Sequence, residues 1–167
     1  DVGRVDISRL LFGVVNLVND RVLKQELTLS VECPEDIGTV DGDERRIRQI
    51  LFNLLSNAIK FNVPGGRITL GATREGSTVA LWVEDTGRGI EAAEQNRVFE
   101  KFETGRGIKR YQGAGLGLSL VRSFVGLHGG KVELNSRRDR GTRVTCVLPA
   151  AVEATANQVA ESPDPVA

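Results

Sequence analysis

The sequence predicts an α/β fold: a two-layer sandwich in which helices cover one face of a mixed sheet. Two long segments, 6–25 and 41–61, carry apolar residues at helical spacing. Strand-like segments instead come in pairs joined by short turns, within 67–85 and 131–149. Hairpins that alternate with helices favour a mixed sheet with helices packed against it over a doubly wound parallel sheet.

The composition sets the size and surface character of the molecule. A length of 167 residues, 40% hydrophobic and 26% charged, suits one domain with a sizeable core, which we place at residues 1–150. The weakly hydrophobic, proline-bearing tail 151–167 is expected to be disordered. The 22 basic and 22 acidic residues cancel, which argues against a nucleic-acid-binding protein. No apolar run is long enough to cross a bilayer, so we expect a chain that is not inserted in a membrane.

Two further features bear on the cellular setting. Cys33 and Cys146 are far apart, lack a C-x-x-C partner and lie in strand-like contexts, so they are predicted to be buried thiols in a reducing cytoplasm. The chain starts at Asp1 and contains no methionine, which indicates a fragment of a longer protein. We therefore expect a cytoplasmic domain, and the sequence leaves open whether the parent protein is anchored in a membrane.

The first helix and first strand follow from simple periodicities. Asp6 is the expected N-cap of a helix. In LTLSVEC, residues 27–33, apolar and polar residues alternate as in a strand, and Pro34 ends it. The residues predicted to form the buried stripe of the helix are Ile7, Leu10, Leu11, Val14, Val18 and Val22.

The second helix, Asp41 to Phe61, presents two different faces. Asp41 followed by Glu44 is predicted to be a capping box at its start. Its second face carries two carboxamides one turn apart with a lysine beyond them, a set that can hold a hard cation and phosphate. The predicted buried stripe is Ile47, Ile50, Leu51, Leu54, Leu55 and Ala58, and the polar face is Asn53, Asn57, Lys60 and Phe61.

The rest of the chain reads as a hairpin, a glycine turn, a short helix, a loop, a long helix and a second hairpin. The first hairpin turns at residues 75–77 and ends at Asp85. A short helix is expected over residues 92–102, and residues 103–112 are predicted to form a mobile basic loop. The last helix is expected to begin near the glycines at 113–117 and to stop at Gly129-Gly130.

Two glycine-rich segments carry possible ligand chemistry. In DTGRGI, residues 85–90, a carboxylate at a strand end is followed by glycines that allow a flat ligand to approach the backbone, although a plain Asp-x-Gly turn has the same pattern. In GAGLGL, residues 113–118, alternating glycines at a helix start can present backbone N–H groups to phosphate. The G-x-G-x-x-G spacing of a dinucleotide-binding fold is absent.

Taken in order, these segments resemble the motifs of one family. NLLSNAIKF resembles the N box of sensor histidine kinases, DTGRGI the first glycine box, FEKF the phenylalanine box and GAGLGL the second glycine box. The resemblance covers residues 6–149 and points to the catalytic and ATP-binding domain of these kinases, within the superfamily that also holds DNA gyrase, Hsp90 and MutL. It implies the Bergerat fold, a two-layer α/β sandwich.

The resemblance also implies a role for each matched position. Asn57 would bind Mg²⁺ directly, with Asn53 beside it and Lys60 on the phosphates; these three are assigned to the chemistry. Asp85 would bind the adenine amino group. The phenylalanines would pack the root of an ATP lid at residues 103–112, and the second glycine box would hinge it. The implied ATP site comprises Asn53, Asn57, Lys60, Phe61, Asp85, Gly87, Gly89, Ile90, Phe99, Phe102, Arg106, Lys109, Arg110, Gly113, Ala114, Gly115, Leu116, Gly117, Leu118 and Thr142.

The implied activity is transfer of the γ-phosphoryl group of ATP, with Mg²⁺, to a histidine. The one histidine of the chain, His128 in LHGG, is predicted to be structural. The acceptor is therefore expected on an upstream dimerisation hairpin of the same protein, and a response regulator or other signalling protein is the expected partner. An ATP-binding signalling scaffold of the DivL type remains the alternative. Hydrolysis of ATP is disfavoured, because Asn53 occupies the place of the general-base glutamate in the hydrolysing relatives and an amide cannot take that proton.

Overall fold

The computed structural model describes residues 2–95 and 108–150, and for 108–117 it describes the backbone alone. The main sheet is mixed, as predicted: its first pair is parallel and its other three pairs are antiparallel. Its strands, in spatial order, are β2 (Thr28–Glu32), β4 (Arg67–Glu75), β5 (Thr78–Asp85), β7 (Gly141–Pro149) and β6 (Lys131–Arg137).

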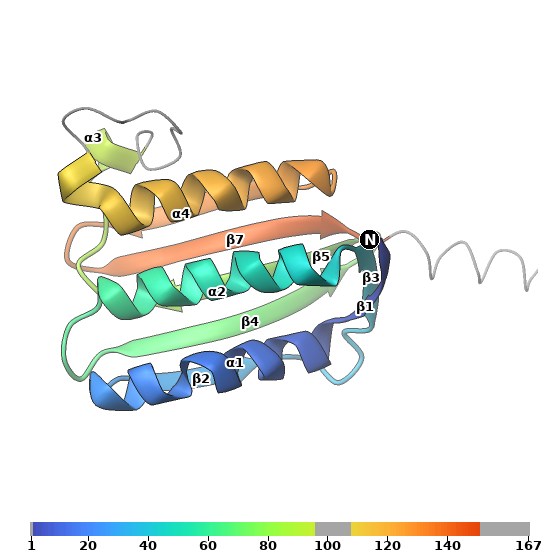
Figure 1. Cartoon of the computed structure of the whole chain (residues 1–167), viewed down its shortest axis with the longest axis horizontal. Coiled ribbons are helices and arrows are strands. Elements are labelled where there is room, and N and C mark those ends of the chain that lie inside the picture. The colour runs from blue at the N-terminus through green and yellow to red at the C-terminus, as the bar shows by residue number, and fades with distance from the viewer. Residues whose placement is uncertain (1, 96–107, 151–167) are drawn as a thin grey trace, which may run out of the picture.

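Three long helices lie on one face of this sheet (Figure 1). They are α1 (Ile7–Lys24), α2 (Glu44–Lys60) and α4 (Ile108–Leu127), and a short helix, α3 (Ala92–Gln95), follows β5. The α2 helix lies between the other two and packs against both of them. The predicted two-layer α/β sandwich is therefore confirmed.

The core lies between the two layers. Every residue predicted for the apolar stripes of α1 and α2 is buried, and Ile59 of α2 joins them. Burying one such aliphatic side chain contributes about 1.5–3 kcal/mol, so these stripes fix how the helices lie on the sheet. From the sheet, Ile68, Leu70, Leu81 and Val83 face the helices. Cys146 is buried, as predicted, whereas Cys33, directly after the edge strand β2, is only half-buried.

The capping prediction was correct for α1 and wrong for α2. The Asp6 carboxylate accepts a hydrogen bond from the Arg9 N–H at 3.1 Å. At α2 the N-cap is Asp43, whose carboxylate accepts from the N–H groups of Arg45 and Arg46. Asp41 instead lies in a strand.

That strand belongs to a small sheet that the sequence did not predict. Strand β1 (Gly3–Asp6) pairs antiparallel with β3 (Thr39–Gly42), and Asp41 lies opposite Arg4. Each of these strands has only four residues, which is too few for an alternation of apolar and polar residues to be recognised in the sequence.

The last helix begins earlier than predicted. Residues 108–112 were expected in a loop, but α4 already includes them and continues through the glycines. Glycine in a helix interior destabilises the helix by about 1 kcal/mol relative to alanine. For this reason the glycines at 113–117 were expected to mark the beginning of the helix and not to lie inside it. Burial of Leu118, Val121 and Val125 against the core stabilises the helix beyond them. The predicted residues Phe99, Phe102 and Arg106 lie outside the described residues.

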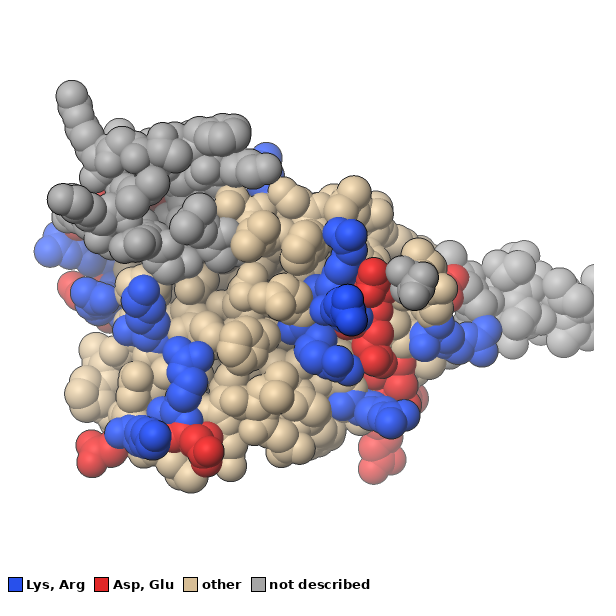
Figure 2. Space-filling view, in the orientation of Figure 1, with Lys and Arg blue, Asp and Glu red and all other residues tan. Residues whose placement is uncertain are grey.

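Charged side chains are concentrated toward the ends of the helical layer. Figure 2 shows two groups of basic side chains on this face with uncharged surface between them. Arg21, Lys24 and Lys60 lie in the last turns of α1 and α2, where positive charge complements the helix dipole. Within the described ranges, no helix combines the length and apolarity needed to cross a bilayer.

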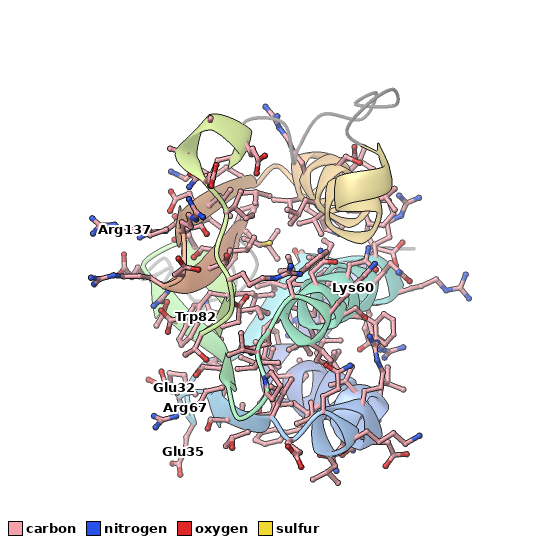
Figure 3. The ribbon with its side chains drawn as sticks, turned by 90° about the vertical axis from the view of Figure 1, so that its left-hand side faces the viewer. Glu32, Glu35, Lys60, Arg67, Trp82 and Arg137 are labelled. Carbon is pink, nitrogen blue, oxygen red and sulfur yellow. The ribbon has the colours of Figure 1, made fainter. Side chains whose placement is uncertain are left out.

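On the opposite face of the sheet, Trp82 occupies a specific site. Its side chain lies on the side away from the helices (Figure 3). The Arg143 guanidinium stacks 4.0 Å from the ring centroid, and a Cβ atom at Gly71 on the adjacent strand would overlap the ring. Gly71 therefore makes the space that the indole fills.

We expect Gly71→Ala to destabilise the fold by about 1–3 kcal/mol, because the added methyl group forces the indole out of its site. Gly13→Ala is the matched control: Gly13 lies in α1 with open space around it, so alanine should stabilise by about 0.5–1 kcal/mol. Urea unfolding followed by the fluorescence of the one tryptophan measures both changes. Equal stabilities of the two variants would contradict the account.

Candidate functional site

A cavity of about 370 Å³ lies at the end of the molecule where α2 and β5 finish. Figure 3 looks onto this end, with Lys60 in the helical layer and Trp82 on the far side of the sheet. The volume falls within the range of small-molecule sites. The lining residues come from segments far apart in the chain: Leu54, Asn57, Ala58, Phe61, Val83, Asp85, Arg88, Gly89, Ile90, Glu91, Glu94, Leu118, Arg138, Asp139, Thr142 and Val144.

Asn57 presents an unsatisfied polar group to this cavity. Leu54 and Ala58 on the same helix are buried, which turns the intervening part of α2 toward the pocket. Within the described part of the chain, no group hydrogen-bonds the buried Nδ2 atom of Asn57. A buried amide without a partner costs about 1–3 kcal/mol, so this side chain is arranged for a ligand that completes it.

Asp85 is the second polar group of the cavity. It is the last residue of β5, and its Oδ1 atom accepts a hydrogen bond from the Gly87 N–H at 2.8 Å. Burial disfavours its charged form and raises the pKa of this carboxyl from 3.8 to about 6, against the opposing effect of hydrogen bonds from Gly87 and Thr142. At neutral pH the carboxylate is thus ionised but poorly solvated.

The glycine loop after Asp85 is held by the turn between β6 and β7. The Ile90 N–H donates to Ser136 Oγ at 2.8 Å, and the Asp139 N–H donates to the Arg88 carbonyl at 2.6 Å. Gly89, with φ of +69°, packs so closely on the Arg137 carbonyl that a Cβ atom would overlap it. The floor of the pocket is therefore formed by two turns, the glycine loop after Asp85 and the β6–β7 turn, which are hydrogen-bonded to each other.

Basic groups flank the aromatic residue at the pocket edge. The Phe61 ring lines the cavity, with Lys60 Nζ 5.5 Å and the Arg88 guanidinium 5.6 Å from its centroid. Both distances are within the range of a cation–π contact. The Lys60 side chain is exposed, so it is free to turn toward an anion at this edge.

The structure brings some of the predicted site residues together and leaves others at the margin. Asn53 does not line the cavity; its Oδ1 atom accepts from Gln49 Nε2 at 2.9 Å. Lys60 and Gly87 lie next to lining residues without lining the cavity themselves. The predicted residues that do line it are Asn57, Phe61, Asp85, Gly89, Ile90, Leu118 and Thr142.

Several predicted residues cannot be placed at the cavity. Phe99, Phe102 and Arg106 lie outside the described residues. For the remainder the structure gives only a helical backbone, at the start of the helix whose Leu118 lines the pocket. They are Lys109, Arg110, Gly113, Ala114, Gly115, Leu116 and Gly117.

The rim contains charged residues that sequence reasoning missed. Arg138 pairs with Glu91 at 3.1 Å and so joins the β6–β7 turn to the glycine loop. Asp139 lies beside it with φ of +63°, a left-handed conformation uncommon outside glycine. The sequence marked residues 139–141 only as a turn, and no spacing rule places that turn beside Asp85.

Comparison with known proteins assigns the family. Residues 42–152 match the model of the histidine kinase-, DNA gyrase B-, and HSP90-like ATPase family. Over 154 residues the chain is 45% identical to the sensor protein DivL of Caulobacter vibrioides, an alignment that covers 89% of this chain and 19% of DivL. The chain thus spans about a fifth of that relative.

Solved structures agree with this assignment. The catalytic domain of histidine kinase ThkA superposes with a TM-score of 0.78 at 26% identity, covering 90% of this chain and 97% of that one. ThkA in complex with response regulator protein TrrA shares the fold, with a TM-score of 0.75 at 24% identity over 90% of this chain and 42% of that one. Full-length ShkA in complex with AMPPNP gives 0.77 at 31% identity, over 89% and 31% of the two chains. The chain therefore belongs to the histidine kinase-, DNA gyrase B-, and HSP90-like ATPase family, as a catalytic ATP-binding domain of the sensor histidine kinase type.

Proposed function

We propose that this domain binds ATP with Mg²⁺ in the cavity between α2 and β5 and passes the γ-phosphoryl group to a histidine on another domain of the same protein. The observation that carries the proposal is the convergence of Asn57 and Asp85 on one cavity. The Nδ2 atom of Asn57 is buried and has no hydrogen-bond partner among the described residues, and Asp85 is a poorly solvated carboxylate. Both gain from a ligand that supplies the missing polar contacts.

The two groups suit opposite ends of the nucleotide. Asp85 Oδ atoms can accept a hydrogen bond from the exocyclic amine of adenine, with Thr142 beside them and Val83 and Val144 against the base. Asn57 lies on the helix that also ends in Lys60, and Leu118 of α4 lines the same cavity. We assign this second region to the phosphates, because it offers amide and cationic groups.

The residues present fit a magnesium ion that arrives with the nucleotide. Mg²⁺ keeps several waters and is bound by one or two protein oxygens together with phosphate oxygens. Asn57 Oδ1 is the protein oxygen that we propose for it, and Asn53 is one turn away. Among the described residues, no group of three His, Cys, Asp or Glu side chains could hold a metal. The ion would supply charge neutralisation at the phosphates.

The transfer step needs a histidine that this chain does not offer. Both ring nitrogens of His128 are engaged in hydrogen bonds, and the chain contains no other histidine. We infer an acceptor on an upstream dimerisation hairpin. Its imidazole nitrogen would bond to the γ-phosphorus as the bond from phosphorus to the β,γ-bridging oxygen breaks; ADP leaves and a ring proton passes to solvent. A response regulator would then be the partner that takes the phosphoryl group.

A second candidate is an ATP-binding scaffold that signals without phosphoryl transfer. The 45% identity to the sensor protein DivL favours it, because the sequence resemblance gives a scaffold of the DivL type as the alternative. The two candidates share the nucleotide site and differ in transfer. Mixing the domain with the helical hairpin of its parent protein and γ-labelled ATP distinguishes them, because label on the hairpin histidine supports the kinase and nucleotide binding without label supports the scaffold. A folded domain that binds no ATP at all would overturn both.

We expect Asn57→Ala to weaken Mg·ATP binding by about 10- to 100-fold, since it removes a polar partner of a charged ligand. Stability without ligand should be unchanged or higher, because the variant loses a buried Nδ2 atom for which the described part of the chain provides no partner. Asn53→Ala is the matched control, one turn away and outside the cavity lining, and its loss should be smaller. Calorimetry with and without Mg²⁺ measures the affinities; a wild-type affinity for Asn57→Ala would refute the assignment.

Asp85→Asn should separate binding from stability. The folded pKa of Asp85 is raised, so its contribution to stability is present below about pH 4 and lost as pH rises through about 6. Asparagine carries no charge, so the variant should melt at a higher temperature than wild type at pH 8 and at a similar one at pH 4. Its affinity for adenosine should fall about tenfold. Thermal scans at the two pH values check the first point, and a variant less stable at pH 8 would contradict it.

Binding of adenosine should depend on pH through the same carboxyl. With a pKa of about 6, about one tenth of Asp85 is ionised at pH 5, so affinity should fall about tenfold between pH 7 and pH 5. Adenosine is the appropriate probe because the phosphates of ATP titrate in the same range. Competition titrations at the two pH values measure the change, which should be absent in Asp85→Asn. If the adenosine affinity of the wild-type chain were the same at both pH values, the Asp85 carboxylate would not be the group that binds the adenine base.

A further inference from the structure

Four residues link the start of α2 to the end of α4, at the end of the molecule opposite the cavity. The Asp43 N–H donates to His128 Nε2 at 3.0 Å, and His128 Nδ1 lies 2.8 Å from the Phe124 carbonyl oxygen. The Arg46 guanidinium lies 5.4 Å from the centroid of the Phe124 ring, and its Nε atom lies 3.4 Å from Asp43 Oδ2. The contacts therefore form a closed cycle between the two helices.

The geometry fixes the tautomer of His128. A backbone N–H can only donate, so Nε2 must be the acceptor from Asp43 and carries no proton. The proton then lies on Nδ1, which donates to the Phe124 carbonyl. That carbonyl is in the last turn of α4, and the His128 N–H bonds to Val125 instead of to it. One neutral ring thus satisfies a backbone group at each helix end.

The site is shaped for this ring. A Cβ atom at Gly42 would come within 2.8 Å of His128 Cδ2 and 3.1 Å of Nε2. Gly42 is the last residue of β3, directly before the N-cap Asp43. A larger residue there would displace the imidazole from the Asp43 N–H, so the close approach and the hydrogen bond depend on each other.

We propose that His128 is a positioning residue for ATP: it ties the end of α4 to the start of α2, so that the glycine-bearing start of α4 stays beside Asn57. The proposal rests on the proposed function. Leu118 of α4 and Asn57 of α2 line the same cavity, whereas His128 is at the other end of this helix pair (Figure 1). A 20-residue helix is about 30 Å long, so a tilt of about 2° at one end moves the other by about 1 Å.

The expected consequence is confined to the phosphate end of the ligand. Asp85 and Thr142 lie on β5 and β7, and their positions are set by strand pairing, in which Asp85 is opposite Thr142. They do not depend on the angle of α4. Loosening α4 should therefore weaken ATP, whose phosphates we place near its start, and leave adenosine unaffected.

Two substitutions separate the bond between helices from the bond within α4. His128→Gln places its amide oxygen near the former Nε2 and can still accept from Asp43, whereas His128→Asn reaches only the former Nδ1. We expect ATP affinity to fall about tenfold in His128→Asn and less than about twofold in His128→Gln, with adenosine affinity unchanged in both. Equal losses in the two variants, or parallel losses of ATP and adenosine, would overturn the proposal.

A stability control and a spectroscopic measurement complete the test. Val18→Ala on α1 removes buried volume far from α4 and should leave the ratio of ATP to adenosine affinity unchanged. Because the chain has one histidine, its imidazole ¹⁵N signals are assigned directly, and they should show the proton on Nδ1. A proton on Nε2 would refute the proposed bond even if a variant failed to fold. Failure of the proposed function would be visible separately, as a wild-type chain without affinity for ATP.

Discussion

Burial of the apolar stripe of α2 is the constraint on which the rest of the structure depends. This helix lies between α1 and α4 and packs on the sheet, and residues such as Leu51 and Leu55 are fully buried. Once that stripe is covered, the rotation of α2 about its axis is fixed. Asn57 then has to lie beside the end of β5, where the sheet presents Asp85. The polar character of the cavity is therefore a consequence of hydrophobic packing.

The cavity keeps two polar groups in conditions that do not favour them. Nδ2 of Asn57 has no hydrogen-bond partner among the described residues, and burial raises the pKa of Asp85 to about 6. Each cost is small compared with the burial of the core, so the fold can sustain both. A ligand that presents a hydrogen-bond donor to the carboxylate, and polar or ionic groups to the amide, removes them. The site then selects such a ligand because other ligands would leave the Asn57 amide and the Asp85 carboxylate without polar contacts.

The two ends of the helical layer have different tasks. At the cavity end, side chains of α2 and α4 line the pocket that we propose for ATP. At the opposite end, Asp43, Arg46, Phe124 and His128 join the same helices through hydrogen bonds and a cation–π contact. Both ring nitrogens of His128 make hydrogen bonds in this link, so in this structure neither of them is free to attack a phosphoryl group. The ring instead connects α2 to α4, because Nε2 accepts a hydrogen bond from the Asp43 N–H and so carries no proton.

The sequence by itself determined the elements that depend on local periodicity. The stripes of α1 and α2, the two hairpins and the N-cap at Asp6 were all predictable, because side-chain spacing sets which face of a helix or strand is buried. Ordered motifs also pointed to Asn57 and Asp85, and both of these residues line the cavity. Only the tertiary structure decided the short β1–β3 sheet, the N-cap at Asp43, and the placement of Arg138 and Asp139 at the rim. These depend on strand pairing and on turns that meet across long separations in the chain, and no local pattern encodes such contacts.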